Sequence, residues 1–174
     1  KLKFQNQFNM GDLAYWPAAK PLSKKNTFAK NRDFIKNLDH IDQIWEKLKF
    51  KCGDTLAVCD LRGKYKEKFS YSELADLITK VSFSFENYGL KKGDVVTVIS
   101  ENSPRWLAVD QGLMRLGAIN AVRGINSPSV ELDYIIGHSN SVGLIVQSKE
   151  IWLKLNNKEE LKKRLKFIIN LEDE

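Results

Sequence analysis

The sequence predicts an α/β fold in which alternating strands and helices form a mainly parallel sheet, preceded by a β-hairpin and an irregular arm. From residue 70 onward, short β-branched apolar runs alternate with longer segments in which apolar residues recur every three or four positions. Serine–proline pairs open two of the expected helices, and glycines follow the ends of others. Elements alternating in this way form right-handed βαβ units, whose parallel sheet needs helices on both faces.

Charge is distributed unevenly along the chain. Residues 1–70 carry 15 Lys and Arg against 8 Asp and Glu, whereas residues 71–174 carry 13 against 14. Residues 1–28 show no regular period, and a helix is expected to begin at Asp39. We therefore divide the chain into an irregular basic arm, residues 1–38, and a partial α/β domain, residues 39–174. A basic arm could contact nucleic acid or anionic lipid headgroups. Because no nucleic-acid-binding module is recognisable, we expect a solvated arm and no nucleic-acid partner.

The first elements expected in the domain are a helix and a hairpin. Apolar residues at helical spacing predict a helix from Asp39 to about Lys49, namely Ile41, Ile44, Trp45 and Leu48. Two short runs, residues 56–60 and a run ending near Phe69, flank a glycine-containing turn at residues 62–64. This arrangement is typical of a β-hairpin.

Capping signals define the first helices of the sheet region. Ser70 and Glu73 form a capping box before a helix that ends ahead of Gly89. Ser103 is the expected cap of the next helix, with Pro104 at its first position. The other elements expected are strands at residues 95–99, 118–122, 143–146 and 167–171 and helices at residues 151–155 and 161–165.

The serine–proline start occurs a second time. Ser127 and Pro128 are expected to open a helix in which apolar residues follow at helical spacing, at Val130, Tyr134 and Ile135. Asn157 is the expected cap of the last helix.

Cysteine usage and hydropathy indicate the compartment. Cys52 and Cys59 have no neighbouring ligand cluster, and the two histidines, His40 and His138, lie far apart in the sequence. We expect reduced thiols and no metal site. No apolar run is long enough to span a membrane, and no signal peptide is visible. We therefore expect a cytoplasmic protein, with peripheral membrane contact left open.

Common catalytic signatures are absent from the sequence. It contains no GxxxxGK[ST] phosphate loop, no GxGxxG after a strand, no GxSxG serine elbow and no HExxH metal motif. Taken alone, the residues do not predict an independent enzyme.

The order of several short motifs is more informative. The motifs are FSYSEL at 69–74, GLKKGDV at 89–95, ENSPRW at 101–106, LGAINAVRG at 116–124, SVELDY at 129–134 and LIV at 144–146. In this order the chain resembles, over about residues 39–171, the start of the adenylate-forming superfamily, which includes acyl-CoA synthetases, firefly luciferase and peptide-synthetase adenylation domains. FSYSEL resembles the family's T/S-Y-x-E-L segment, and LGAINAV resembles its L-x-x-G-A-x-x-V-P stretch.

One departure from the family pattern narrows the resemblance. Where most members have Val-Pro or Asn-Pro, this chain has Arg123 and Gly124 after Val122. Together with the ENSPRW segment and the turn at residues 137–139, this feature is similar to the acyl-acyl-carrier-protein synthetases of cyanobacteria and plastids. Those enzymes are classed with the long-chain acyl-CoA ligases. The resemblance implies a two-step reaction: a fatty acid and Mg-ATP give an acyl-adenylate, and the thiol of CoA or acyl carrier protein then takes the acyl group.

The resemblance also implies that the chemistry lies outside this chain. The family's phosphate-binding stretch, T-S-G-T-T-G-x-P-K-G, and its later Lys-containing segment do not occur. Amides and hydroxyls of such a loop would cradle the triphosphate. We therefore expect an amino-terminal fragment that contains no catalytic or cofactor-binding residues, is inactive alone and binds neither ATP nor Mg. We also expect it to expose apolar surface and to self-associate.

Three residues are candidates to face a substrate. Arg123 follows an expected strand, at the edge where open α/β sheets bind ligands, although it could equally bond loop carbonyls or a carboxylate. Trp106 could line an acyl cavity or belong to the core, and Asn102 follows a strand and could contact a ligand. Glu73 and Asp94 are expected to serve a cap and a turn.

Two other functions remain open from the sequence. One is a stand-alone α/β binding module whose basic arm docks on lipid or nucleic acid. The other is a small flavodoxin-like nucleotide-binding enzyme.

Overall fold

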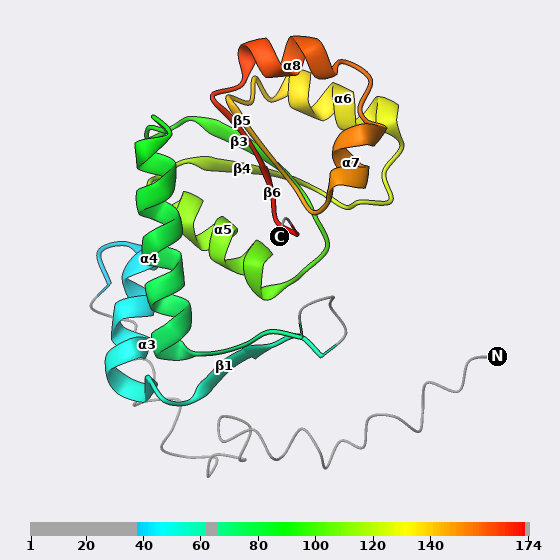
Figure 1. Ribbon diagram of the computed structural model, residues 1–174. Helices are drawn as coiled ribbons and strands as arrows, with labels where there is room; N and C mark the ends of the chain where they lie inside the picture. Colours follow the sequence, from blue (N-terminus) through cyan, green and yellow to red (C-terminus); the bar gives the residue numbers. More distant parts are fainter. Residues whose placement is uncertain (1–37, 62–65, 173–174) are drawn as a thin grey trace, which may run out of the picture. The chain divides into compact units, whose positions relative to one another are not determined.

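A computed structural model describes residues 38–61 and 66–172 of the chain (Figure 1). These residues belong to two compact units, one containing residues 38–61 and 66–75 and the other residues 76–172. The predicted arm, residues 1–38, lies outside the described residues except for Leu38, so the arm and the boundary after it stay predictions.

The first unit contains the predicted helix and hairpin. A 3-10 turn, η3 (Ile41–Gln43), leads into helix α3 (Ile44–Cys52), which extends three residues beyond the predicted end. Strands β1 (Leu56–Cys59) and β2 (Lys68–Ser70) pair antiparallel, so the hairpin is confirmed. The predicted turn at residues 62–64 lies outside the described residues.

The capping box before helix α4 (Tyr71–Asn87) is confirmed. The Glu73 backbone N–H donates to Ser70 Oγ over 3.2 Å, and the Ser70 N–H donates to Glu73 Oε2 over 2.8 Å. Hydrogen bonding of the Glu73 carboxylate to the Ser70 backbone N–H, and secondarily to the Ser70 side chain, lowers the pKa of Glu73, because it favours the ionised form. Gly89, at a φ of +77°, follows the helix and adopts the left-handed conformation expected after a helix end.

The second unit is built on a parallel sheet with strand order β4-β3-β5-β6. The strands are β3 (Val95–Ile99), β4 (Ile119–Arg123), β5 (Gly143–Val146) and β6 (Phe167–Asn170). All three strand pairs are parallel, which confirms the predicted sheet. Strand β4 lies one residue later than expected, so Arg123 is its last residue and pairs with Ile99.

Helices cover both faces of this sheet, as predicted (Figure 1). Helix α5 (Pro104–Arg115) and the second unit's part of α4 pack on one face, and α6 (Ser129–His138), α7 (Lys149–Lys154) and α8 (Lys158–Arg164) pack on the other. Successive strand residues alternate between the faces. Val98 of β3 belongs to the cluster under α5, whereas its neighbour Ile99 belongs to the cluster under α6 and α8.

The two serine–proline pairs behave differently. Ser103 accepts a hydrogen bond from the Trp106 N–H over 3.0 Å and caps α5, with Pro104 in the first turn, as predicted. The expected start of α6 at Ser127 is wrong, because Pro128 stands at the cap position and no side chain caps the helix. Ser127 lies in a turn instead, where its N–H donates to the Gly124 carbonyl over 3.3 Å.

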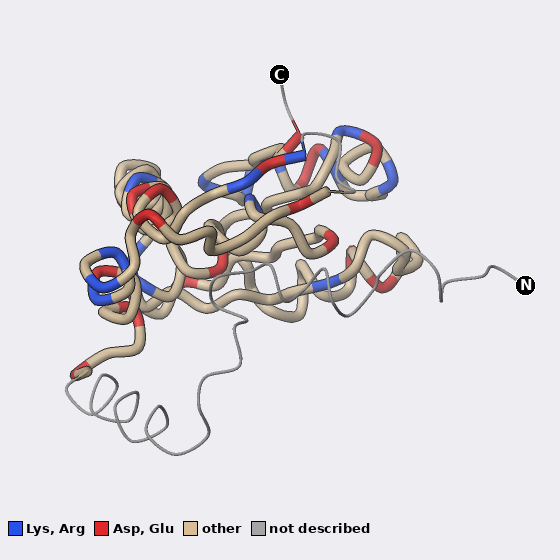
Figure 2. The backbone as a smooth tube through the Cα atoms, turned by 90° about the horizontal axis from the view of Figure 1, so that it is seen from below, with Lys and Arg blue, Asp and Glu red and all other residues tan. Residues whose placement is uncertain are grey.

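The helix after Ser127 buries other apolar residues than those whose spacing predicted it. Val130 and Tyr134 of α6 are 74% and 61% exposed, and the buried residues are Leu132 and Ile136. Asn157 does precede α8, but its side chain makes no cap hydrogen bond. Figure 2 colours the backbone by residue type and shows basic and acidic positions interspersed along the described chain, in keeping with 13 basic and 14 acidic residues at positions 71–174.

Candidate functional site

The carboxyl edge of the parallel sheet is the candidate site. Open α/β sheets bind ligands outside the carboxyl ends of their strands, where neighbouring strands lead to opposite faces. Strand β3 leads to α5 on one face, and its neighbour β5 leads to α7 on the other. From β3 the chain continues to β4 at one edge of the sheet, and from β5 it continues to β6 at the other edge. The strand order therefore reverses between β3 and β5, and this is the topological switch point of the sheet.

Arg123 occupies the end of β4 at this edge. Its Nε lies 3.0 Å from Glu131 Oε1 at the start of α6, and its guanidinium also donates to the Val122 carbonyl. The Arg123 and Glu131 side chains are 42% and 46% exposed, so solvent screens the pair and limits its contribution to stability. Arg123 therefore bonds a carboxylate and a backbone carbonyl, which is the structural role that the sequence left open. A contact between Arg123 and a ligand stays a prediction.

Asn102 and Trp106 follow the neighbouring strand, β3. Asn102 is exposed in the loop before α5, and Trp106 is half-buried in the first turn of that helix. The Trp106 ring packs against the cluster under α5, and its buried Nε1 has no hydrogen-bond partner within the described residues. The Trp106 contact is thus a core contact, and its predicted role in an acyl cavity stays a prediction.

A backbone hydrogen bond brings these two loops together. The Ser100 N–H donates to the Arg123 carbonyl over 3.1 Å, which holds the segment after β3 beside the end of β4. Within the described chain no hydrogen bond joins the side chains of Arg123, Asn102 and Trp106 to one another. The three candidates therefore share one edge of the sheet without forming a connected cluster.

Gln147, which the sequence analysis did not single out, links three strand ends at this edge. Its Oε1 accepts from the Glu101 N–H over 2.9 Å, and its Nε2 donates to Glu172 Oε1 over 3.0 Å. Its own N–H donates to the Ile99 carbonyl over 2.8 Å. A polar residue directly after a fully buried strand was the signal that could have identified it.

The end of β6 is also tied to helix α5. The Arg105 guanidinium donates to the Leu171 carbonyl, and the Leu171 N–H donates to the Val146 carbonyl over 2.9 Å. Together with the bonds of Gln147, these contacts connect the ends of β3, β5 and β6 and the first turn of α5. Hydrogen bonds therefore connect the segments that follow the strands at the switch point.

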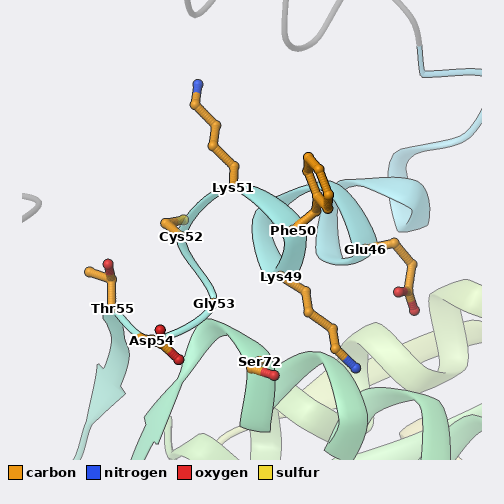
Figure 3. Close-up of a pocket in the computed structure, with 9 residues that line it drawn as sticks. All are labelled: Glu46, Lys49, Phe50, Lys51, Cys52, Gly53, Asp54, Thr55 and Ser72. Carbon is orange, nitrogen blue, oxygen red and sulfur yellow. The ribbon is translucent and has the colours of Figure 1, made fainter.

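A pocket of about 690 Å³ lies in the first unit, around the end of α3 (Figure 3). It is lined by Glu46, Lys49, Phe50, Lys51, Cys52, Gly53, Asp54, Thr55 and Ser72. The Lys51 side chain points away from Ser72, and Phe50 is 95% exposed. Gly53 allows the tight turn, since an added Cβ would lie 2.6 Å from the Lys49 carbonyl oxygen. None of the predicted site residues lines this pocket.

The described residues offer no cluster of metal-binding side chains. Within residues 38–61 and 66–172 no three His, Cys, Asp or Glu side chains are grouped to hold a metal ion. The sequence also lacks the hydroxyl- and glycine-rich run expected to cradle a triphosphate. Among the helices of the described part, none has the length and apolarity needed to cross a membrane.

The chain is similar in sequence to two chloroplastic proteins of Arabidopsis thaliana. It is 34% identical over 131 residues to "Probable acyl-activating enzyme 16" and 33% identical over 131 residues to a long-chain-fatty-acid–[acyl-carrier-protein] ligase. Each match covers 75% of this chain and 18% of the relative. A crotonobetaine/carnitine–CoA ligase of Escherichia coli is 27% identical over 111 residues, 63% of this chain and 22% of that protein.

Solved structures share the fold. The inhibitor-bound N-terminal domain of FACL13 from Mycobacterium tuberculosis matches with a TM-score of 0.68 at 16% identity, over 76% of this chain and 33% of that one. The N-terminal subdomain of NpsA from Klebsiella oxytoca, in complex with 3-hydroxyanthranilyl-AMSN, matches with a TM-score of 0.60 at 22% identity, over 68% of this chain and 28% of that one. Residues 45–174 match the sequence profile of the AMP-binding enzymes. The chain belongs to the AMP-binding enzyme family.

Proposed function

We propose that this chain is the amino-terminal part of an ATP-dependent fatty-acid-activating ligase. The complete enzyme would join a fatty acid to AMP, releasing pyrophosphate, and would then transfer the acyl group to the thiol of CoA or acyl carrier protein. The observation that carries the proposal is the identity of 33–34% over 131 residues to an acyl-activating enzyme and a fatty-acid–[acyl-carrier-protein] ligase. The match to a CoA ligase is weaker, at 27% over 111 residues.

In this proposal the chain supplies scaffold and one wall of the substrate site. ATP and Mg²⁺ would be held by residues outside these 174. The family's phosphate-binding run does not occur in the sequence, and the described residues include no cluster of metal-binding side chains. Arg123, Asn102 and Trp106 would face the fatty acid from the carboxyl edge of the sheet. The chain alone would neither bind ATP tightly nor turn over.

The acceptor thiol and the cellular location belong to the same proposal. CoA and acyl carrier protein are both chemically suitable, because each presents a thiol at the end of a flexible arm. We place the complete enzyme in the cytoplasm, with contact to a membrane surface when it collects its apolar substrate.

The proposal is tested first by the gene. The natural reading frame should continue beyond Glu174 and encode a TSGTTGxPKG-like run within a few dozen residues. A stop codon close to Glu174 would favour the stand-alone binding module instead.

The complete gene product should then be assayed with fatty acids of graded chain length, with CoA and acyl carrier protein offered in parallel. We expect acyl-thioester formation that depends on both ATP and a fatty acid. A product that binds lipid vesicles but forms no acyl-adenylate with any fatty acid would contradict the proposed function.

A further inference from the structure

We infer that Gln147 is a positioning residue for the substrate wall of the proposed ligase, holding the loop that carries Asn102 in place through its side-chain amide. The inference rests on the proposed function for its kinetic consequence, and on hydrogen bonds of the second unit for its geometry.

Gln147 lies at the point where the parallel strands β3 and β5 separate. The β3–β5 ladder ends at the pair Ile99–Val146, and the Gln147 N–H makes the following bond, to the Ile99 carbonyl over 2.8 Å. Beyond that point the chain after β3 turns away toward α5 and leaves the ladder. Gln147 Oε1 accepts from the Glu101 N–H over 2.9 Å and takes the place of a strand carbonyl.

The other half of the same amide reaches β6. Gln147 Nε2 donates to Glu172 Oε1 over 3.0 Å, and the Glu172 N–H donates back to the Gln147 carbonyl over 2.9 Å. One half-buried side chain therefore connects the end of β6 to the loop after β3, across the switch point of the sheet.

The chemistry of this position is specific to an amide. At neutral pH only Asn and Gln side chains carry both an acceptor and an uncharged donor of peptide type, and Asn is one methylene shorter. A carboxylate here could still accept from the Glu101 N–H, but it would face the Glu172 carboxylate at hydrogen-bond distance. An apolar side chain at position 147 would remove both the bond to the Glu101 N–H and the bond to the Glu172 carboxylate.

The functional consequence follows from the position of Asn102. This residue comes directly after Glu101, whose N–H is fixed by Gln147, and it is exposed at the carboxyl edge where the fatty acid is proposed to lie. Releasing the Glu101 N–H should let the loop move, and displacements of about 1 Å in a substrate-positioning group can cost as much as a hundredfold in rate. Loss of this hydrogen bond should therefore raise the KM for the fatty acid rather than the KM for ATP.

The first test measures the loop directly. Amide hydrogen exchange of the 174-residue chain should be followed by NMR in the wild type and in Gln147→Met, which is close to isosteric and removes both hydrogen bonds. We expect the Glu101 amide to exchange at least about tenfold faster in the variant, with the Val98 amide unchanged. Equal exchange of Glu101 in both proteins would overturn the inference.

The second test uses a charge exchange in the complete gene product. Gln147→Glu should raise the KM for the fatty acid roughly tenfold, with the KM for ATP within about threefold of wild type. Glu172→Gln alone should be mild, because the oxygen of the introduced amide could still accept from Gln147. The double variant should regain most of the lost affinity, since the amide introduced at position 172 can donate to the new carboxylate at position 147.

A matched control makes the same substitution away from the carboxyl edge. Gln111→Glu in α5 also places a carboxylate against an existing one, because Gln111 Nε2 lies 2.8 Å from Asp110 Oδ2. It should leave the KM for the fatty acid unchanged. Equal KM effects of Gln147→Glu on ATP and fatty acid, or no rescue in the double variant, would assign Gln147 a merely structural role and overturn the inference.

Failure of the proposed function is distinguishable from failure of this inference. If the wild-type gene product activates no fatty acid, the proposed function fails, and the exchange rate of the Glu101 amide still decides whether Gln147 holds the loop.

Discussion

Lys166 Nζ lies 2.7 Å from Asp94 Oδ2 and thereby joins the start of β6 to the turn before β3. The same carboxylate oxygen accepts from the Lys91 N–H over 2.9 Å, and Lys166 also donates to the Gly89 carbonyl over 2.8 Å. Asp94 therefore serves the turn, as the sequence predicts, and also an ion pair across the sheet. The hydrogen bond from Lys166, followed by that from the Lys91 backbone, lowers the pKa of Asp94.

Asp94→Asn should lower the free energy of unfolding at pH 7 by about 1 kcal/mol, a value reduced for solvent screening of a partly exposed pair. Because the folded-state pKa lies below the unfolded value, the contribution of Asp94 is complete above the unfolded pKa, near 4, and is lost as the pH falls through the folded pKa. Urea unfolding between pH 2 and pH 7 would measure this. The wild type and the variant should therefore converge at low pH.

The control for this pair is the exposed ion pair between Lys162 and Glu159, whose side chains are 53% and 81% exposed. Glu159→Gln should change the free energy of unfolding by no more than about 0.5 kcal/mol. A larger loss from Glu159→Gln than from Asp94→Asn would contradict the assignment of the stronger interaction to Asp94.

Ser103→Ala should destabilise the chain by about 1 kcal/mol, because it removes the acceptor of the Trp106 N–H at the start of α5. Ser127→Ala is the matched control, since Ser127 precedes a proline in the same way but caps nothing. It should be nearly neutral in the same thermal or urea unfolding experiment. Equal losses of unfolding free energy in the two variants would contradict the capping role of Ser103.

This pair of serines shows what sequence could and could not predict. Both are followed by proline, and local chemistry makes them equivalent. The distinction is tertiary: Ser127 is held in a turn by the Gly124 carbonyl, and the apolar residues that α6 buries are Leu132 and Ile136. For α6, local signals therefore predicted that a helix follows the serine–proline pair, but not how it is capped or which residues it buries.

The parallel sheet was predictable because its signals are redundant. The run at residues 95–99 is apolar, β-branched and short, and its neighbours repeat the pattern between capped helices. The candidate site was harder to predict from the sequence. Arg123 and Asn102 could be located from the strand ends, but the role of Gln147 depends on strand order, which places β5 beside β3 rather than beside β4.

Gly143→Ala should destabilise the chain by about 1–3 kcal/mol. An added Cβ at this position of β5 would lie 2.4 Å from a ring atom of Phe167, its partner in β6, and the buried ring would have to shift. Gly137→Ala in α6 is the control, because an added Cβ there meets nothing within 4 Å. It should be neutral or should stabilise the helix by up to about 1 kcal/mol in urea unfolding. Comparable destabilisation by both substitutions would contradict the packing of Phe167 against Gly143.

The 174-residue chain should self-associate through strand β4. This strand is an edge of the described sheet, and two of its apolar residues, Ile119 and Val122, are 53% and 37% exposed. Edge strands offer unpaired backbone groups to other chains, and a charged side chain on the edge discourages this. Val122→Lys should shift the sedimentation profile toward monomer, whereas Val130→Lys, on the exposed side of α6, should not. A wild-type chain that stays monomeric at high concentration would refute the prediction.

We propose that this scaffold belongs to a fatty-acid-activating ligase whose ATP chemistry lies outside these 174 residues. The most direct measurement is ATP–pyrophosphate exchange, carried out side by side with the complete gene product and with the 174-residue chain in the presence of a long-chain fatty acid. We expect exchange by the complete product only when fatty acid is added, and none by the 174-residue chain. Exchange catalysed by the chain alone, or no exchange by the complete product with any fatty acid tried, would overturn the proposed function.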